Sequence, residues 1–315
     1  MFKSKFAILL FGLLIAAPQM ASALEMPMGL QMPQNGTQLA EMFGVNAQSY
    51  VVEDVNSGQM LISNNSNMAW PPASLTKLVT ALVVLDTKPR LYNTVAMTEA
   101  DQAAGWCDQG GACIKAAPGV RFTVDGLFHA ALMPSANNAA NALARSTGLP
   151  MRTFVDRMNQ KAASLGATNT HFNEPTGMDP ANQITARDYA KIVTAAFANP
   201  YLKEVANTQR YLLRSTNNWR YTQTIQNTDK LLADADVQML GAKTGYLDES
   251  RYNFASLLKY DGQKLAVVVL GEPHLYTAFA ETKLLASLAN QAEFLAYDYL
   301  QPMVLGTSTG VSMAN

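Results

Sequence analysis

A serine and a lysine stand three residues apart in a stretch that is otherwise almost wholly apolar. Ser74 and Lys77 lie in residues 73–85, which favour a buried helix, so the spacing puts both side chains on one helix face. Burial disfavours the charged form of a lysine, and a neutral Lys77 could accept the proton of the serine hydroxyl. Ser74 would then be a nucleophile. Taken alone, the pattern more often reflects a capping serine beside a lysine that extends to water.

A second polar pair follows a proline. Pro134 would set a turn before a helix over 135–146, so Ser135 and Asn137 can point into a cleft. A hydroxyl and an amide placed there can relay a proton and hold a peptide group. The ordinary alternative is a helix N-cap, a position at which both residue types are preferred.

A third motif, Lys243-Thr244-Gly245, ends a strand expected over 237–244. The lysine supplies positive charge and the threonine supplies a hydroxyl for a carboxylate. The glycine lets a substrate backbone lie close to the strand. An ordinary strand end with a turn glycine would have the same sequence.

The elements that must position these motifs change along the chain. Runs typical of strands occupy 48–54 and 59–63, joined by turn residues 56–58, and then 237–244, 252–258 and 264–270. Helical patterns lie between them over 124–133, 135–146, 151–165 and 185–197, and a long helix is expected over 278–300. This order predicts an α+β fold, in which an antiparallel sheet of about five strands from both chain ends is flanked by helices. The helical region, about 73–200, is inserted into the sheet.

Residues 1–23 have the features of a secretory signal peptide: two early lysines, an apolar run over 6–17, and the small residues Ala21 and Ala23. The run is too short to span a bilayer comfortably, so an uncleaved anchor is the weaker alternative. We expect cleavage after Ala23, export to the periplasm and no transmembrane anchor in the mature chain. Residues 24–47 predict a flexible leader, 48–300 a single catalytic domain and 301–315 a short tail.

Composition excludes several classes of protein. Of the 315 residues 49% are hydrophobic, and 23 basic against 24 acidic residues leave a net charge of −1, which predicts no nucleic-acid-binding face. Two cysteines and three histidines leave little to build a metal site, so we expect neither metal nor cofactor. Export would expose Cys107 and Cys113 to an oxidising space, and their short glycine-containing spacer predicts a local disulfide. Two unrelated buried thiols are the alternative.

Together, in this order and on these elements, the three motifs are specific. They match the set found in penicillin-binding proteins and class A β-lactamases. Over about 48–300 the chain resembles the low-molecular-mass penicillin-binding proteins, the D-alanyl-D-alanine peptidases of the S11 type, with a β-lactamase/transpeptidase-like fold. The segments that carry the resemblance are 72–78, 135–140, 171–178, 185–188 and 241–245. Two of them, 72–77 and 174–177, look most like the endopeptidase branch.

The resemblance implies a role for each catalytic residue. Ser74 would attack the carbonyl of a D-alanyl bond in peptidoglycan, and Lys77 would take its proton. Ser135 would pass a proton to the leaving amine. The backbone N–H groups of Ser74 and Tyr246 would form the oxyanion hole, and β-lactams would acylate Ser74 as substrate mimics.

The same resemblance implies a set of substrate-binding residues. Asn137 would hold the substrate amide, while Lys243 and Thr244 would fix the substrate carboxylate. Gly245 would let the substrate lie against the strand, and Arg187 would support the carboxylate end.

The chain departs from the major carboxypeptidases of the family after the strand over 264–270. Those enzymes carry an arginine after two glycines there, whereas this chain has Gly271-Glu272-Pro273-His274. The departure favours endopeptidase activity on cross-links, with trimming of stem peptides secondary. A class A β-lactamase would need a deacylating glutamate in a Glu-x-x-Leu-Asn segment, but neither Glu174 nor Glu204 is followed by that pattern. A penicillin-binding scaffold without turnover is the non-enzymatic alternative.

Overall fold

The computed structural model describes residue 33 and residues 35–304 of the chain. The expected signal peptide, the first part of the expected leader and residues 305–315 lie outside the described residues. Among the residues that are described, no helix is both long and apolar enough to cross a membrane.

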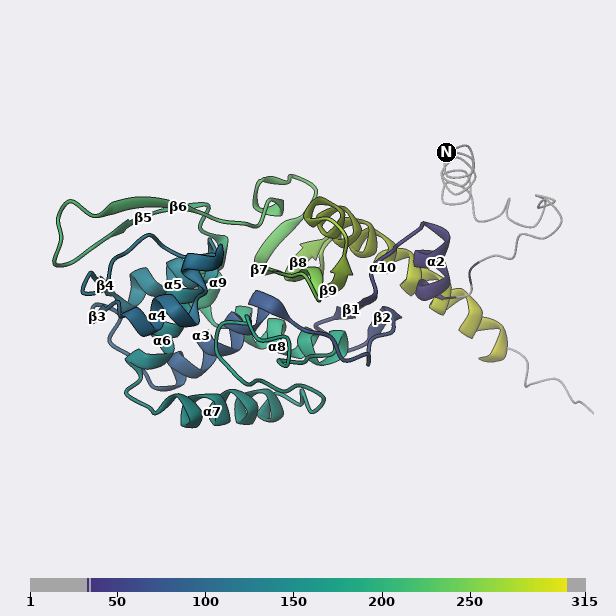
Figure 1. Cartoon of the computed structure of the whole chain (residues 1–315). Coiled ribbons are helices and arrows are strands. Elements are labelled where there is room, and N and C mark those ends of the chain that lie inside the picture. Colours follow the sequence, from purple (N-terminus) through teal and green to yellow (C-terminus); the bar gives the residue numbers. More distant parts are fainter. Residues whose placement is uncertain (1–32, 34, 305–315) are drawn as a thin grey trace, which may run out of the picture.

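A five-stranded antiparallel sheet joins the two ends of the chain, in the order β2-β1-β9-β8-β7 (Figure 1). Its strands are β1 (Ser49–Asp54), β2 (Met60–Asn64), β7 (Gln238–Leu247), β8 (Arg251–Tyr260) and β9 (Gln263–Glu272). Asp261 and Gly262 form the tight turn between β8 and β9, and both have the positive φ that such turns require. The predicted fold is therefore confirmed, and β7 lies at the edge that faces the helical region.

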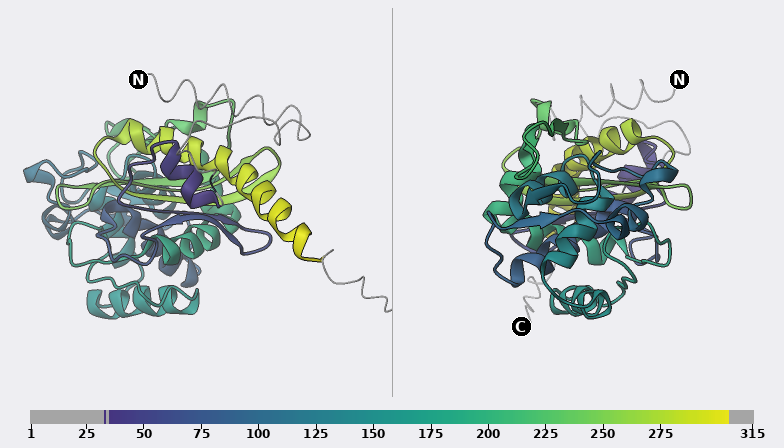
Figure 2. Two further views of the ribbon diagram at one scale, coloured as in Figure 1. Left: turned by 90° about the vertical axis from the view of Figure 1, so that its right-hand side faces the viewer. Right: turned by 60° about the vertical axis from the view of Figure 1, so that its left-hand side comes forward.

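Alternate residues of the sheet enter two separate hydrophobic cores. Val51, Ala266 and Val268 point to the core shared with the helical region, whereas Val52 and Val267 point to the other face. On the first side α8 (Ala186–Ala198) packs against β1, β8 and β9, and on the second side α10 (Leu275–Val304) covers the sheet. The sheet thus lies between two helical layers (Figure 2).

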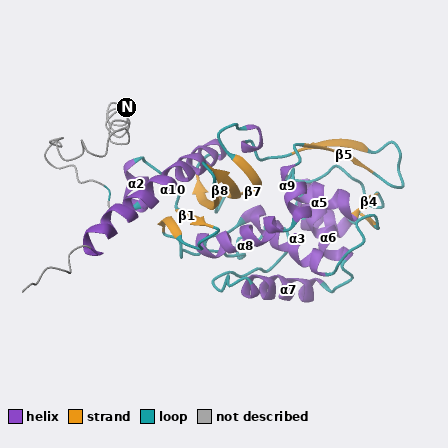
Figure 3. Ribbon diagram, turned by 180° about the vertical axis from the view of Figure 1, so that it is seen from behind, coloured by secondary structure: helices purple, strands orange, loops and turns teal. Residues whose placement is uncertain are grey.

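The helical region fills the space beside β7 and below the sheet (Figure 3). Its helices are α3 (Thr76–Asp86), α4 (Glu99–Ala104), α5 (Val124–Leu132), α6 (Asn137–Ser146), α7 (Met151–Ser164) and α9 (Pro200–Asn207), with 3₁₀ turns η2 (Ala73–Leu75), η3 (Cys107–Gln109) and η4 (Leu231–Ala233). Helix α3 is buried over most of its length, as expected for a helix that is apolar on all sides. Two small antiparallel sheets complete the region: β3 (Thr94–Ala96) with β4 (Arg121–Thr123), between which α4 and η3 intervene, and the hairpin of β5 (Arg210–Arg214) with β6 (Thr222–Gln226).

Several predicted boundaries were wrong. Part of the expected flexible leader is the helix α2 (Gly36–Met42), because Leu39 and Ala40 are buried and the helix packs against α10. The expected tail begins too early, since α10 runs on to residue 304. Strand β7 does not end at Thr244 but continues to Leu247, paired throughout with β8. The third motif therefore lies inside a strand.

Candidate active site

Ser74 and Lys77 meet at the junction of η2 and α3. Lys77 is 1% exposed, and its Nζ donates hydrogen bonds to Ser74 Oγ at 2.7 Å, Asn137 Oδ1 at 2.6 Å and the Thr176 carbonyl oxygen at 2.6 Å. Burial lowers the pKa of Lys77 to about 7, partly opposed by the charge of Glu174. Near neutral pH a substantial fraction of Lys77 is thus uncharged and able to accept the proton of Ser74.

A second lysine–serine pair lies opposite the first. Lys243 Nζ, on β7, donates to Ser135 Oγ at 2.8 Å and to the Thr244 carbonyl oxygen at 2.9 Å. Ser135 does not begin a helix as expected, since it precedes α6 with φ of +66° in the left-handed region. Burial and the charge of Lys77 hold the pKa of Lys243 well below its usual range. Two buried ammonium groups cannot readily be charged together, so one of them tends to be neutral.

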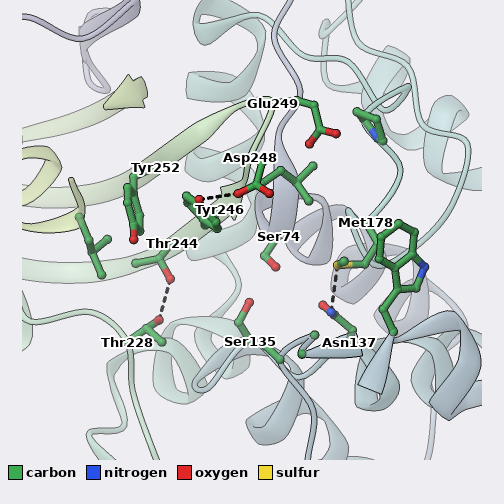
Figure 4. Close-up of a pocket in the computed structure, with 18 of the residues that line it drawn as sticks. Ser74, Ser135, Asn137, Met178, Thr228, Thr244, Tyr246, Asp248, Glu249 and Tyr252 are labelled. Atoms are coloured by element: carbon green, nitrogen blue, oxygen red, sulfur yellow. Dashed lines mark hydrogen bonds between the residues drawn. The ribbon is translucent and has the colours of Figure 1, made fainter. Parts of the chain in front are cut away.

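Two threonine hydroxyls meet on the β7 side of the site. Thr244 Oγ1 lies 2.7 Å from Thr228 Oγ1, and the Thr228 amide donates to the Met133 carbonyl oxygen at 3.1 Å (Figure 4). Thr228 was not identified from the sequence, because it is a lone threonine in a loop with no motif around it. The pair is suited to hold a carboxylate, which accepts hydrogen bonds from hydroxyl groups.

Two glycines allow other backbone segments to reach the nucleophile. A Cβ on Gly245 would lie 2.8 Å from the Pro72 carbonyl oxygen and 3.2 Å from Ser74 N. A Cβ on Gly177, whose φ is +85°, would lie 1.9 Å from the Ala73 carbonyl oxygen. Only glycine fits at either position, so β7 and the 174–177 loop clamp the turn that carries Ser74.

The loop that supplies the third acceptor for Lys77 is organised by one carboxylate. Glu174 accepts hydrogen bonds from Thr176 N at 2.7 Å, from Asn182 Nδ2 at 2.9 Å and from Gly177 N. Both of its oxygens are therefore engaged within the loop. A deacylating glutamate must instead present a free oxygen to water, and this argues against a class A β-lactamase.

The disulfide loop forms the opposite wall. Cys107 and Cys113 are joined by a disulfide, with Cα atoms 5.7 Å apart. The loop holds Asn137 from both ends: Asn137 N donates to the Ala112 carbonyl oxygen at 2.6 Å, and Asn137 Nδ2 donates to the Gly105 carbonyl oxygen at 3.1 Å. With its Oδ1 on Lys77, Asn137 is a fixed part of the wall.

These groups open into one cleft with a volume of about 560 Å³. The hydroxyls of Ser74 and Ser135 lie in its centre, with Thr244 on one side and Asn137 on the other (Figure 4). Tyr246, half exposed, lines the mouth and donates its hydroxyl to Asp248 Oδ1 at 2.6 Å. The resemblance implied a role only for the backbone N–H of Tyr246, not for its side chain.

Arg187 does not belong to this assembly. It is an exposed residue in the first turn of α8, it does not line the cleft, and its charge acts on Glu53 of β1. Its backbone N–H donates to the Ser66 carbonyl oxygen, which fixes the start of α8 against the turn after β2. The role expected for Arg187 at the substrate carboxylate is therefore wrong. Within the described residues, no cluster of potential metal ligands is present.

Comparisons with known proteins agree on one family. The family model of D-alanyl-D-alanine carboxypeptidases, peptidase S11, matches residues 35–274. A D-alanyl-D-alanine carboxypeptidase of Mycobacterium tuberculosis is 37% identical over 71% of this chain and 74% of its own length. A D-alanyl-D-alanine endopeptidase of Pseudomonas aeruginosa is 32% identical over 74% of each chain. The crystal structure of a Streptomyces DD-transpeptidase superposes with a TM-score of 0.73 at 25% identity, covering 78% of this chain and 98% of that one.

Proposed function

The chain belongs to the peptidase S11 family of D-alanyl-D-alanine carboxypeptidases, and from that premise we propose how its residues divide the work. The protein is a serine-type D,D-peptidase that acts on peptidoglycan. The observation that carries the assignment of roles is the pair of buried lysine–serine contacts, Lys77 with Ser74 and Lys243 with Ser135, which converge in one cleft.

Acylation begins with transfer of the Ser74 hydroxyl proton to neutral Lys77 Nζ. Ser74 Oγ then attacks the carbonyl carbon on the acyl side of the D-alanyl bond. The negative charge that develops on the carbonyl oxygen is held by the N–H groups of Ser74 and Tyr246, and the close approach of Gly245 to Ser74 N supports this assignment. β-Lactams acylate Ser74 by the same route.

Collapse of the tetrahedral intermediate expels the amine. Ser135 donates a proton to that amine and regains one from Lys243, its hydrogen-bond partner, and Lys243 in turn recovers the proton that Lys77 took from Ser74. The net transfer is from Ser74 to the leaving amine, and Lys77 is neutral again before water arrives. Thr244 and Thr228 hold the carboxylate that lies beside the cleaved bond. Water then attacks the acyl-enzyme, with Lys77 as base, and releases the shortened peptide.

We propose that cross-linked peptides are the preferred substrates and that free stem peptides are secondary. The arginine of the major carboxypeptidases has no counterpart here, because Glu272 follows Gly271 and is fully buried. The hydroxyl pair of Thr228 and Thr244 then carries more of the recognition of the carboxylate. Both substrate types present a carboxylate beside the cut bond, so one site serves both.

The proposed compartment rests on where the substrate lies and on the sequence of residues 1–23. Peptidoglycan lies outside the inner membrane, and the start of the chain has the pattern of a cleavable signal peptide ending at Ala23. We therefore place the mature enzyme in the periplasm.

The test combines labelling and digestion. In one reaction the purified protein and its Ser74→Ala variant are incubated with fluorescent penicillin. In separate reactions without penicillin they are incubated with cross-linked dimeric muropeptides or with monomeric pentapeptides, and the products are identified by mass spectrometry. Covalent labelling that depends on Ser74, together with faster loss of dimers, supports the proposal. Labelling of the Ser74→Ala variant would overturn the nucleophile. Release of D-alanine from pentapeptides with no cleavage of dimers would overturn the substrate preference.

A further inference from the structure

The hairpin β5–β6 presents two different faces. Its inner face packs on the helical region: the Tyr211 ring stacks on His129 at 3.8 Å, Tyr221 meets Phe122 edge-on at 5.1 Å, and Leu213 is buried. Because strand residues alternate between faces, the other side of the hairpin must face solvent. The hairpin runs along the outer edge of the helical side of the molecule (Figure 1).

The outer face carries an uncompensated positive charge. Arg210 and Arg214 of β5 and Arg220 of the connecting loop are all exposed, and we call these three residues the arginine strip. Between residues 209 and 227 the sequence has no aspartate or glutamate. In the described part of the chain none of the three pairs with a carboxylate. For a protein with a net charge of −1, this is a local excess of three positive charges.

An exposed aromatic residue stands beside the strip. Trp219 is 83% exposed at the tip of the hairpin, and the Arg220 guanidinium lies over its ring at 5.1 Å from the centroid. A flat indole next to guanidinium groups suits a partner that combines apolar ring faces with carboxylates.

We propose that the arginine strip and Trp219 bind carboxylate-bearing peptidoglycan outside the catalytic cleft. This rests on the proposed function, since the polymer whose stem peptides enter the cleft also carries the carboxylates and sugar rings that the strip would contact. The hairpin is tied to the cleft at its base, where Asn227 Nδ2 donates to the carbonyl oxygens of Ala206 and Thr208 and the next residue is Thr228. Attachment of the polymer through the arginine strip as well as the cleft raises the effective concentration of cleavable D-alanyl bonds at the cleft.

An anionic membrane is the competing partner and fits less well. The outward residues of the two strands include a single apolar side chain, Leu212, and those of β6 are Thr222, Thr224 and Gln226. Insertion into a lipid interface needs a broad apolar face. Carboxylate recognition by guanidinium groups needs none.

Binding is measured separately from catalysis. Intact sacculi are sedimented with the Ser74→Ala protein, which cannot digest them, with and without the triple change R210A/R214A/R220A. The matched control is R152A/R157A/K259A, which removes three exposed cations elsewhere. We expect about tenfold weaker binding for the strip variant, little change for the control, and binding that weakens with added salt, as charge-assisted contacts require.

The active forms separate the two proposals. With Ser74 intact, the strip variant should cleave soluble dimeric muropeptides at an unchanged rate and digest sacculi about tenfold more slowly, because only the second attachment is lost. Unchanged soluble turnover also shows that the variant is folded, and Trp219→Ala is a milder second variant. Equal binding of strip and control variants to sacculi would overturn the proposal, as would binding to anionic phospholipid vesicles in preference to sacculi. If the unmodified protein does not cleave soluble muropeptides at all, the proposed function is overturned instead.

Discussion

The amide nitrogen of Ser74 lies 3.2 Å from the point where a Cβ on Gly245 would stand. The same Cβ would lie 2.8 Å from the Pro72 carbonyl oxygen, so it would push backbone rather than a flexible side chain. The edge strand and the turn that carries Ser74 are in direct contact, and their separation would set the width of the oxyanion site that we propose.

Gly245→Ala should therefore lower the rate of penicillin acylation about a hundredfold, the usual effect of losing one oxyanion-hole donor. The protein should still fold, because the methyl group displaces the turn only locally. Acylation rates are measured with fluorescent penicillin. Gly119→Ala, at a glycine outside the cleft where φ is +87° and a Cβ meets no atom within 4 Å, is the control for backbone strain alone. An acylation rate equal to that of the unmodified protein would contradict the assignment of this contact to the oxyanion site.

The pH dependence of acylation should report Lys77. Its pKa is lowered to about 7, and only the neutral form can accept the proton of Ser74. The rate should therefore rise as the pH increases through about 7 and level off above it. Stopped-time labelling from about pH 5 to about pH 9 measures the profile. A rate that is flat across this range would remove Lys77 as the base.

Thr228→Val should weaken recognition of the substrate carboxylate. It removes one of the two hydroxyls in the pair with Thr244 while keeping the shape of the side chain. We expect KM for peptide substrates to rise about tenfold, the size of one hydrogen bond to a charged group, with a smaller change in kcat. Thr224→Val on the exposed side of β6 is the matched control. Equal KM values for the two variants would show that Thr228 does not contact the substrate.

A buried carboxyl on the other side of the sheet should make stability depend on pH. Glu272 is fully buried beside Glu281, whose own oxygens accept hydrogen bonds from the backbone N–H groups of Asn46 and Ala47. Burial, and then the nearby Glu281, raise the pKa of Glu272 from 4.5 to about 8. The folded state holds a proton that the unfolded chain releases, so its stabilising effect is full below about pH 4.5 and is lost as the pH rises towards about 8.

Glu272→Gln imitates the protonated form at every pH. It should leave Tm unchanged near pH 4.5 and raise it by a few degrees at pH 8, and thermal melts across this range measure the difference. Glu249→Gln, at an exposed carboxylate, should give no such pH-dependent gain. If the Tm difference between Glu272→Gln and the unmodified protein does not grow with pH, Glu272 is not buried as a neutral acid.

The sequence predicted the sheet and the Ser74–Lys77 pair because both have local signals. Alternating or apolar runs predict strands, and a motif of fixed spacing predicts the pair. Ser135 and Lys243 were each found in a motif, but their contact joins segments 108 residues apart and needed the structure. Thr228 and Glu174 could not be found this way: each acts through a loop brought to the site by packing between segments distant in sequence. The prediction for Arg187 was wrong for the opposite reason. Its motif matches the family, but a motif does not determine where an exposed side chain lies.

The prediction of a flexible leader over 24–47 was wrong for a similar reason. Residues 36–42 have no apolar periodicity of their own, and the helix forms because Leu39 and Ala40 find partners on the opposite end of the chain. A helix this short is not stable in water by itself, so tertiary packing determines whether residues 36–42 are helical.

The pairing of β1 with β9 also sets the order in which the molecule can assemble. Ser49 is the partner of Leu270, and the whole helical region and the strands β2, β7 and β8 lie between them in the sequence. Such a contact closes a very long loop and forms late. During synthesis Ser74 and Lys77 exist well before β7, β8 and β9 have been made. Until then the chain has no completed catalytic cleft, and the turn that carries Ser74 is clamped only when the last strands join the first.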